Sequence, residues 1–181
     1  MDWLRIVDKY YPEGTELRRI LLTHSEGVAR KALAIVDAHP ELGADRDFVA
    51  DAAMLHDVGI FLTDAAGIQC FGTEPYIRHG VLGAALMREE GCERIARVCE
   101  RHTGTGLTRE QIVRRQLPLP HRDFLPETVE EEIICYADKF FSKTRPEEEK
   151  TVEQARRSLM KFGEEGVARF DAWTARFALS R

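Results

Sequence analysis

A histidine and an aspartate, His56 and Asp57, stand together in this chain directly after an apolar run. The run, Ala52-Ala53-Met54-Leu55, has the composition of a buried helix, and Val58-Gly59 follows the pair. Burying an imidazole beside a carboxylate is costly unless another group pairs with them, and a divalent metal ion is the usual group that makes such a pair favourable. We therefore expect the fold to bring further ligands to this point, although a cap at the end of a helix is the simpler interpretation of the pair taken alone.

Three other histidines and one aspartate recur at similarly apolar places in the sequence. They are His24, His79, His102 and Asp138. A single histidine on an apolar helix face is more often a hydrogen-bonded core residue than a ligand. One shared cause explains six such residues better than six coincidences do. Because imidazole and carboxylate are good ligands for Zn²⁺, Mn²⁺ or Fe²⁺, the sequence predicts a metal site built from all six.

Apolar residues recur at helical spacing along almost the whole chain. The expected helices cover residues about 2–11, 14–38, 46–57, 78–90, 92–102 and 108–115, then a segment from Thr128 through Asp138, and two helices within about 147–179. Residues 59–76 and the proline-rich segment 118–126 are expected to be loops. Thr108 and Gln111 have the spacing of a capping box. With no convincing strand, the fold class predicted is all-α, a helical bundle.

The chain's 181 residues fit a single domain, which we expect to span residues 1–181. A net charge of −5 without a long basic cluster argues against duplex nucleic acid as a partner. The sequence contains no apolar run long enough to span a membrane and no apolar signal core, so we expect a cytoplasmic protein with no membrane partner. The four cysteines lack metal-binding spacing and are expected to be free thiols. Both a monomer and a homodimer remain open.

The order of the six predicted ligands, together with their neighbours, resembles the HD-domain superfamily of metal-dependent phosphohydrolases. The matching segments are Thr23–Ala29, Leu55–Gly59 in its HDIG form, His79–Ala84, Glu100–Gly104 and Tyr136–Lys139. The resemblance covers roughly residues 16–142 and leaves the helices of about 147–179 outside it. It implies an HD-domain-like helical bundle.

The resemblance also implies roles for the six residues. A first divalent ion would be held by His24, His56, Asp57 and Asp138. A second ion would be held by His79 and His102, with Asp57 bridging the two. Two ions per chain are therefore expected, and Fe, Mn, Zn, Ni and Mg all remain candidates.

Two such ions can bind one phosphoryl group and turn a shared water into the attacking hydroxide. The implied substrate is a small phosphorylated molecule, with a nucleotide favoured, cleaved at a phosphate ester or anhydride bond. Relatives that cleave cyclic dinucleotides often carry a lysine where this chain has Ile60, and they carry a GYP triplet that this chain lacks. These differences count against a cyclic dinucleotide.

Three basic residues, Arg78, Arg101 and Lys139, adjoin predicted ligands and could contact phosphate. Neighbours on a helix point about 100° apart, so solvent or an acidic partner is the simpler expectation for each. Lys139 has the best claim, because it closes a ligand-bearing helix. The predicted catalytic residues are Asp57, as the shared metal ligand, and Lys139 and Arg78, as cations that could contact phosphate.

Two histidines stand apart from the predicted ligands. His39 is expected only to mark a helix end. His121, in the proline-rich segment, is expected on the surface, although that segment could fold over the site.

Two other function classes use the same residues. One is an HD-type oxygenase, in which a mixed-valent di-iron pair activates O₂; turnover under O₂ would distinguish it. The other is a non-catalytic metal- or nucleotide-binding module. The complete ligand set counts against the module, and ligand binding that survives metal loss would favour it.

Overall fold

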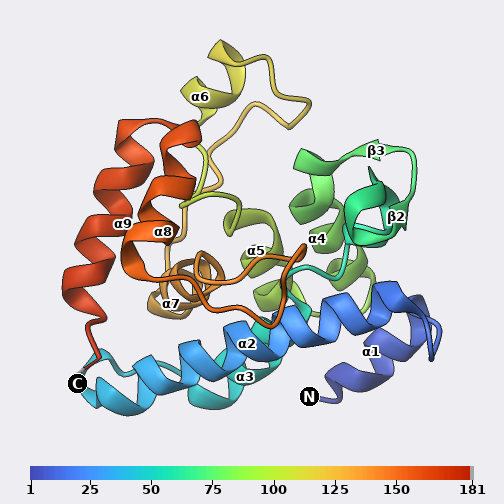
Figure 1. Ribbon diagram of the computed structural model, residues 1–181, viewed down its shortest axis with the longest axis horizontal. Helices are drawn as coiled ribbons and strands as arrows, with labels where there is room; N and C mark the ends of the chain where they lie inside the picture. Colours follow the sequence, from blue (N-terminus) through green and yellow to red (C-terminus); the bar gives the residue numbers. More distant parts are fainter. Residues whose placement is uncertain (180–181) are drawn as a thin grey trace.

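The computed structural model describes residues 1–179 of the chain. Its helices, in chain order, are α1 (Trp3–Tyr10), α2 (Glu16–Ala38), α3 (Arg46–Leu55), α4 (His79–Glu89), α5 (Glu93–Arg101), α6 (Arg109–Arg114), α7 (Val129–Asp138), α8 (Val152–Leu159) and α9 (Glu164–Arg176). The long helix α2 packs against α3 and α7, and α4 packs against α5 (Figure 1). The C-terminal pair α8 and α9 covers one side of this bundle, and α6 projects from one end (Figure 1). The predicted helices are confirmed.

Capping side chains define where several of these helices begin. Thr15, Asp45 and Thr128 each accept a hydrogen bond from a backbone N–H three residues further on, at the start of α2, α3 and α7. Thr108 and Gln111 form the predicted reciprocal capping box of α6. Each cap satisfies an N–H group that has no partner within its helix. The caps of α2, α3 and α7 thereby fix the start of helices that carry or lead into predicted ligands.

One apolar core runs through the bundle and includes the C-terminal helices. Leu21 on α2, Leu55 on α3, Ile134 on α7 and Phe170 on α9 are all fully buried. The Tyr136 ring packs 5.2 Å from the ring of Phe170, which ties α9 to α7. A smaller cluster lies beneath α6 and consists of Leu107, Ile112, Leu119 and Phe124.

Two glycines allow the backbones of the histidine-bearing segments to touch. A Cβ added at Gly59 would lie 2.3 Å from the Gly83 nitrogen and 2.4 Å from the His79 oxygen. A Cβ added at Gly80 would lie 2.5 Å from the Cys99 oxygen. Only glycine permits contacts this close, so the turn after α3 is held against α4, and α4 against α5.

Residues 59–76 depart from the prediction. They contain three short strands, β1 (Thr63–Ala65), β2 (Cys70–Phe71) and β3 (Glu74–Pro75), in the order β2-β1-β3. β1 runs antiparallel to β2 and parallel to β3. The expectation of a plain loop without strands was wrong here, because strands of two or three residues are too short to show an alternating pattern. The all-α class holds for the rest of the described chain.

Two further sequence expectations concern the cysteines and the membrane. Cys70, Cys92, Cys99 and Cys135 are all free. Within residues 1–179, none of the helices combines the length and the apolar character that crossing a bilayer requires.

Candidate metal centre

The structure brings all six predicted ligands together from five parts of the chain. His24 lies within α2, His56 and Asp57 form the turn after α3, His79 begins α4, His102 follows α5, and Asp138 ends α7. They make two buried groups whose ligand atoms lie within 4.8 Å of one another. The first ligand group is His24, His56, Asp57 and Asp138, and the second ligand group is Asp57, His79 and His102.

The spacing within the first ligand group matches that of ligands around one ion. Nε2 of His24 lies 3.0 Å from Oδ1 of Asp138 and 3.1 Å from Oδ2 of Asp57. Nε2 of His56 lies 3.0 Å from the same Asp57 oxygen. Ligand atoms bound about 2.1 Å from a metal ion lie about 3.0–3.4 Å apart in octahedral or tetrahedral geometry. The four side chains therefore already have the spacing that a metal needs.

Asp57 also belongs to the second ligand group, through its other oxygen. Oδ1 of Asp57 lies 3.3 Å from Nε2 of His102 and 3.5 Å from Nε2 of His79. The two imidazole nitrogens are 3.0 Å apart. Asp57 thus gives one carboxylate oxygen to each group, which is the arrangement of a bridging ligand.

Backbone carbonyls set the orientation of three of the four imidazoles. Nδ1 of His56, His79 and His102 each lies 2.7 Å from the carbonyl oxygen three residues earlier. Each Nδ1–H donates to that carbonyl, which leaves Nε2 as the nitrogen that faces the group. Hydrogen bonds of this kind commonly orient metal-binding histidines.

This orientation puts two nitrogen lone pairs face to face in the second ligand group. With both Nδ1 atoms protonated, neither Nε2 of the His79–His102 pair carries a proton to share. Burial, followed by the neighbouring His102, lowers the pKa of His79 to about 3, and burial also lowers the pKa of His102. Oδ1 of Asp57, the oxygen that faces these two imidazoles, has no hydrogen-bond donor. A cation between these atoms resolves the repulsion, so the residues fit a bound divalent metal.

The first ligand group is electrostatically different, because it carries two carboxylates. Burial alone would lower the pKa of His56, but Asp57 and Asp138 outweigh that effect and raise it to about 9. Burial opposes the charge of Asp138, yet the adjacent Lys139 and the histidines hold its pKa well below the ordinary value. This group therefore attracts positive charge strongly.

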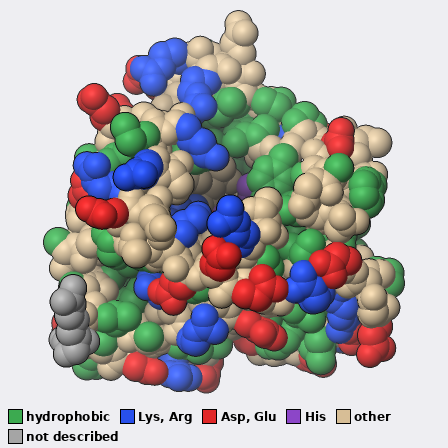
Figure 2. Space-filling view, in the orientation of Figure 1, with side chains coloured by type: hydrophobic (Ala, Val, Ile, Leu, Met, Phe, Trp, Pro, Cys, Tyr) green, Lys and Arg blue, Asp and Glu red, His purple; other side chains and the backbone are tan. Residues whose placement is uncertain are grey.

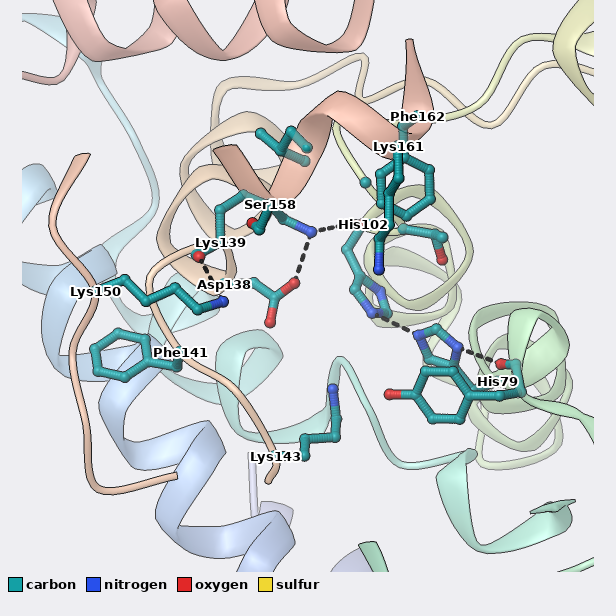
Figure 3. A pocket seen from close by; sticks show the side chains of 14 residues that line it. His79, His102, Asp138, Lys139, Phe141, Lys143, Lys150, Ser158, Lys161 and Phe162 are labelled. Atoms are coloured by element: carbon teal, nitrogen blue, oxygen red, sulfur yellow. Dashed lines mark hydrogen bonds and ion pairs between the residues drawn. The ribbon is translucent and has the colours of Figure 1, made fainter. Parts of the chain in front are cut away.

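Both groups border a cavity of about 190 Å³ (Figure 3). His79, His102 and Asp138 line it, together with four lysines: Lys139, Lys143, Lys150 and Lys161. From outside, a histidine is visible at the base of a hollow beside which Lys and Arg side chains gather (Figure 2). A cationic cavity above metal ligands is suited to an anionic ligand.

The predicted residue Lys139 lies in the wall of this cavity. Its Nζ is 2.7 Å from Oδ2 of Asp138 and donates to the backbone oxygen of His102 over 2.8 Å (Figure 3). Lys139 thus contacts Asp138 of the first ligand group and His102 of the second ligand group.

Arg78 and Arg101 lie elsewhere. The Arg78 guanidinium is paired with Glu74, and Arg78 is not among the residues that line the cavity. Arg101 lies 2.6 Å from Glu127 and donates to the Leu125 carbonyl. The acidic partner, Glu74, lies four residues earlier in β3. This geometry counts against a catalytic Arg78, which stays a prediction.

The two remaining histidines take the expected places. His39 ends α2, and its Nε2 lies 2.9 Å from the oxygen of Ala178. His121 is exposed in the proline-rich segment.

One cation at the centre was missed by the sequence reasoning. Nζ of Lys143 lies 2.5 Å from Oδ2 of Asp57, and this carboxylate raises the pKa of Lys143 even though burial opposes it. Lys143 follows α7 in a segment without helical periodicity. Its position five residues after Asp138 was the only available signal.

Comparison with known families agrees with this geometry. The sequence profile of the HD domain family matches residues 21–142, a segment that contains all six predicted ligands. The chain belongs to the HD domain family.

Its relatives are longer proteins. The chain is 35% identical over 127 residues to a tRNA (cytidine(56)-2'-O)-methyltransferase of Picrophilus torridus, and 37% identical over 125 residues to the uncharacterized protein MJ0778 of Methanocaldococcus jannaschii. These matches cover 70% and 68% of this chain, but 33% and 65% of the two relatives. The chain therefore spans less than two thirds of either relative.

Two solved structures of the HD domain of the L. monocytogenes phosphodiesterase PgpH share the fold. One, in complex with cyclic-di-AMP, has a TM-score of 0.53 at 15% identity and covers 100% of this chain and 99% of that one. The other has a TM-score of 0.54 at 19% identity and covers 99% and 89%. At this identity the likeness concerns the fold alone.

Proposed function

We propose that this protein is a metal-dependent phosphohydrolase that cleaves a phosphate ester or anhydride bond of a small molecule, with a nucleotide as the favoured substrate. One observation carries the proposal: Asp57 gives one oxygen to each of two buried ligand groups at the base of a cationic cavity. When bound, a pair of divalent ions supplies polarisation of the phosphoryl oxygen and activation of water.

The protein's own groups would orient the reaction and balance its charge. The carbonyls that accept from His56, His79 and His102 keep every Nε2 turned toward the centre. Lys139 holds the Asp138 carboxylate and adds positive charge to the wall that would face a phosphoryl group. Fixed charges in a partly closed site stabilise developing negative charge without reorganisation.

The comparisons support a nucleotide substrate only in general terms. A fold neighbour binds cyclic-di-AMP, but Ile60 and the missing GYP triplet count against that compound here. The methyltransferase name belongs to a relative of which this chain spans a third, so we do not propose methyl transfer.

A phosphate-release assay over mononucleotides, nucleoside triphosphates and dinucleoside polyphosphates tests the proposal. We expect release from at least one compound, loss of release with a chelator, and recovery when Mn²⁺ is added back. His56→Ala should remove the activity, whereas His121→Ala, which alters an exposed histidine, should keep it. O₂ consumption without phosphate release, or chelator-insensitive release, would overturn the proposal.

A further inference from the structure

Three lysine ammonium groups point into the same space in front of the ligand groups (Figure 3). Lys143 reaches it from the segment after α7, Lys150 from the segment before α8, and Lys161 from the 3-10 turn Met160–Phe162. The carboxylate of Asp138 and the ring of His102 face them across the cavity (Figure 3). This arrangement depends on the tertiary fold, because the lysines come from three separate segments.

The lysines differ in how their charges are balanced. Lys139 is paired with Asp138, and Lys143 with Asp57. Within residues 1–179, neither Lys150 nor Lys161 makes an ion pair with a carboxylate. Nζ of Lys150 has only the backbone oxygen of Lys139 within reach, at 3.5 Å. Two ammonium groups in the cavity wall are therefore not paired directly with a carboxylate of the described residues.

Of these two lysines, Lys150 has the larger cost of burying its charge. It is partly buried, and burial lowers its pKa from the ordinary value. Placing an ammonium group away from water without a partner costs free energy. None of the carboxylates among residues 1–179 pairs with Lys150 to offset that cost. An anionic group of a bound ligand would offset it.

We propose that Lys150 and Lys161 form a second anion site for a phosphate group that is not the one cleaved. The inference rests on the proposed function, in which the phosphate to be cleaved lies at the ligand groups. It narrows the substrate class to organic diphosphates and polyphosphates, such as nucleoside di- and triphosphates, and away from monophosphate esters.

The shape of the site agrees with a ligand longer than one phosphate. Lys143, Lys150 and Lys161 also line an adjoining cavity of about 450 Å³, whose other walls include Ile68, Ser142 and Thr144. Small-molecule sites commonly have volumes of about 300–1,000 Å³. The lysines thus stand between the ligand groups and a space large enough for the organic part of the substrate.

The test compares two probes that cannot be hydrolysed, methylenediphosphonate and methylphosphonate, by calorimetric titration of the metal-containing protein. A charge-assisted hydrogen bond accounts for about tenfold in affinity, so we expect the diphosphonate to bind at least about tenfold more tightly. The Lys150→Gln/Lys161→Gln double variant should lose about tenfold or more of its diphosphonate affinity. Its methylphosphonate affinity should change by less than about threefold.

Lys9→Gln is the matched control, because Lys9 lies on α1, is exposed, and pairs with Glu90. It should bind both probes as the unaltered protein does. Metal content measured after each titration shows whether the diphosphonate has extracted metal. If the double variant does not fold, the same two titrations are made with the single variant Lys161→Gln, which changes an exposed position.

Equal diphosphonate affinity in the unaltered and altered proteins, or the absence of any preference over methylphosphonate, would overturn the inference. The experiments distinguish failure of the second anion site from failure of the proposed phosphohydrolase activity. Phosphate release from monophosphates without a diphosphonate preference removes the second anion site and leaves the hydrolase. A lysine-dependent preference without phosphate release from any compound removes the hydrolase and leaves the anion site.

Discussion

Nζ of Lys143 lies 2.5 Å from Oδ2 of Asp57, the same oxygen that faces His24 and His56. The ammonium group supplies positive charge at a buried carboxylate whose pKa is held well below its ordinary value, against the effect of burial. An ion held by His24, His56 and Asp57 would put a second positive charge beside this ammonium group. We therefore expect a bound metal ion and Lys143 to compete for one carboxylate oxygen.

This competition predicts the behaviour of Lys143→Met. In chelator-treated protein the variant should be less stable by about 3 kcal/mol, because it leaves a buried carboxylate without its partner. At saturating metal the difference in free energy of unfolding should largely disappear. Urea unfolding with and without metal measures this, with Lys9→Met as the surface control. An equal loss of stability in both conditions would show that the two do not compete.

Asp57→Asn tests the shared ligand. Because both carboxylate oxygens face ligand groups, we expect metal loss from both and a fall in phosphate release of at least about a thousandfold. Circular dichroism should still report a helical protein. Asp64→Asn makes the same chemical change at an exposed strand residue and should leave metal content and rate unchanged. Full metal content in Asp57→Asn would mean that the ligands are assigned incorrectly.

Gly59→Ala tests the close approach between the turn after α3 and α4. The new Cβ would collide with backbone atoms of Gly83 and His79, so we expect a loss of about 3 kcal/mol in stability. Gly67→Ala adds the same methyl group where nothing lies within 4 Å, and it should change stability by less than about 1 kcal/mol. Denaturant titration of the two variants gives the comparison, and similar midpoints would argue against the steric account.

The helices and the clustering of the six predicted ligands could be predicted because their signals are local or repeated. Helical spacing and caps such as Thr108 mark the elements, and each predicted ligand lies on an otherwise apolar face. The order of these ligands along the chain then supplied the family resemblance, which the match over residues 21–142 confirms.

The cations of the cavity could not be predicted in the same way. Lys150 and Lys161 belong to segments that look solvent-exposed in sequence, and only the packing of α8 and the turn after it brings them over the end of α7. Arg78 is the opposite case, because its position next to His79 suggested a catalytic role. In the structure its guanidinium pairs with Glu74 of β3.

Metal content of freshly purified protein, measured by elemental analysis for the unaltered chain and for His79→Ala, shows how many ions the centre holds. His79 contributes to the second ligand group alone, so we expect about two ions per chain in the unaltered protein and about one in the variant. An unaltered protein without metal, or a His79→Ala variant with the same metal content, would contradict the two-metal centre.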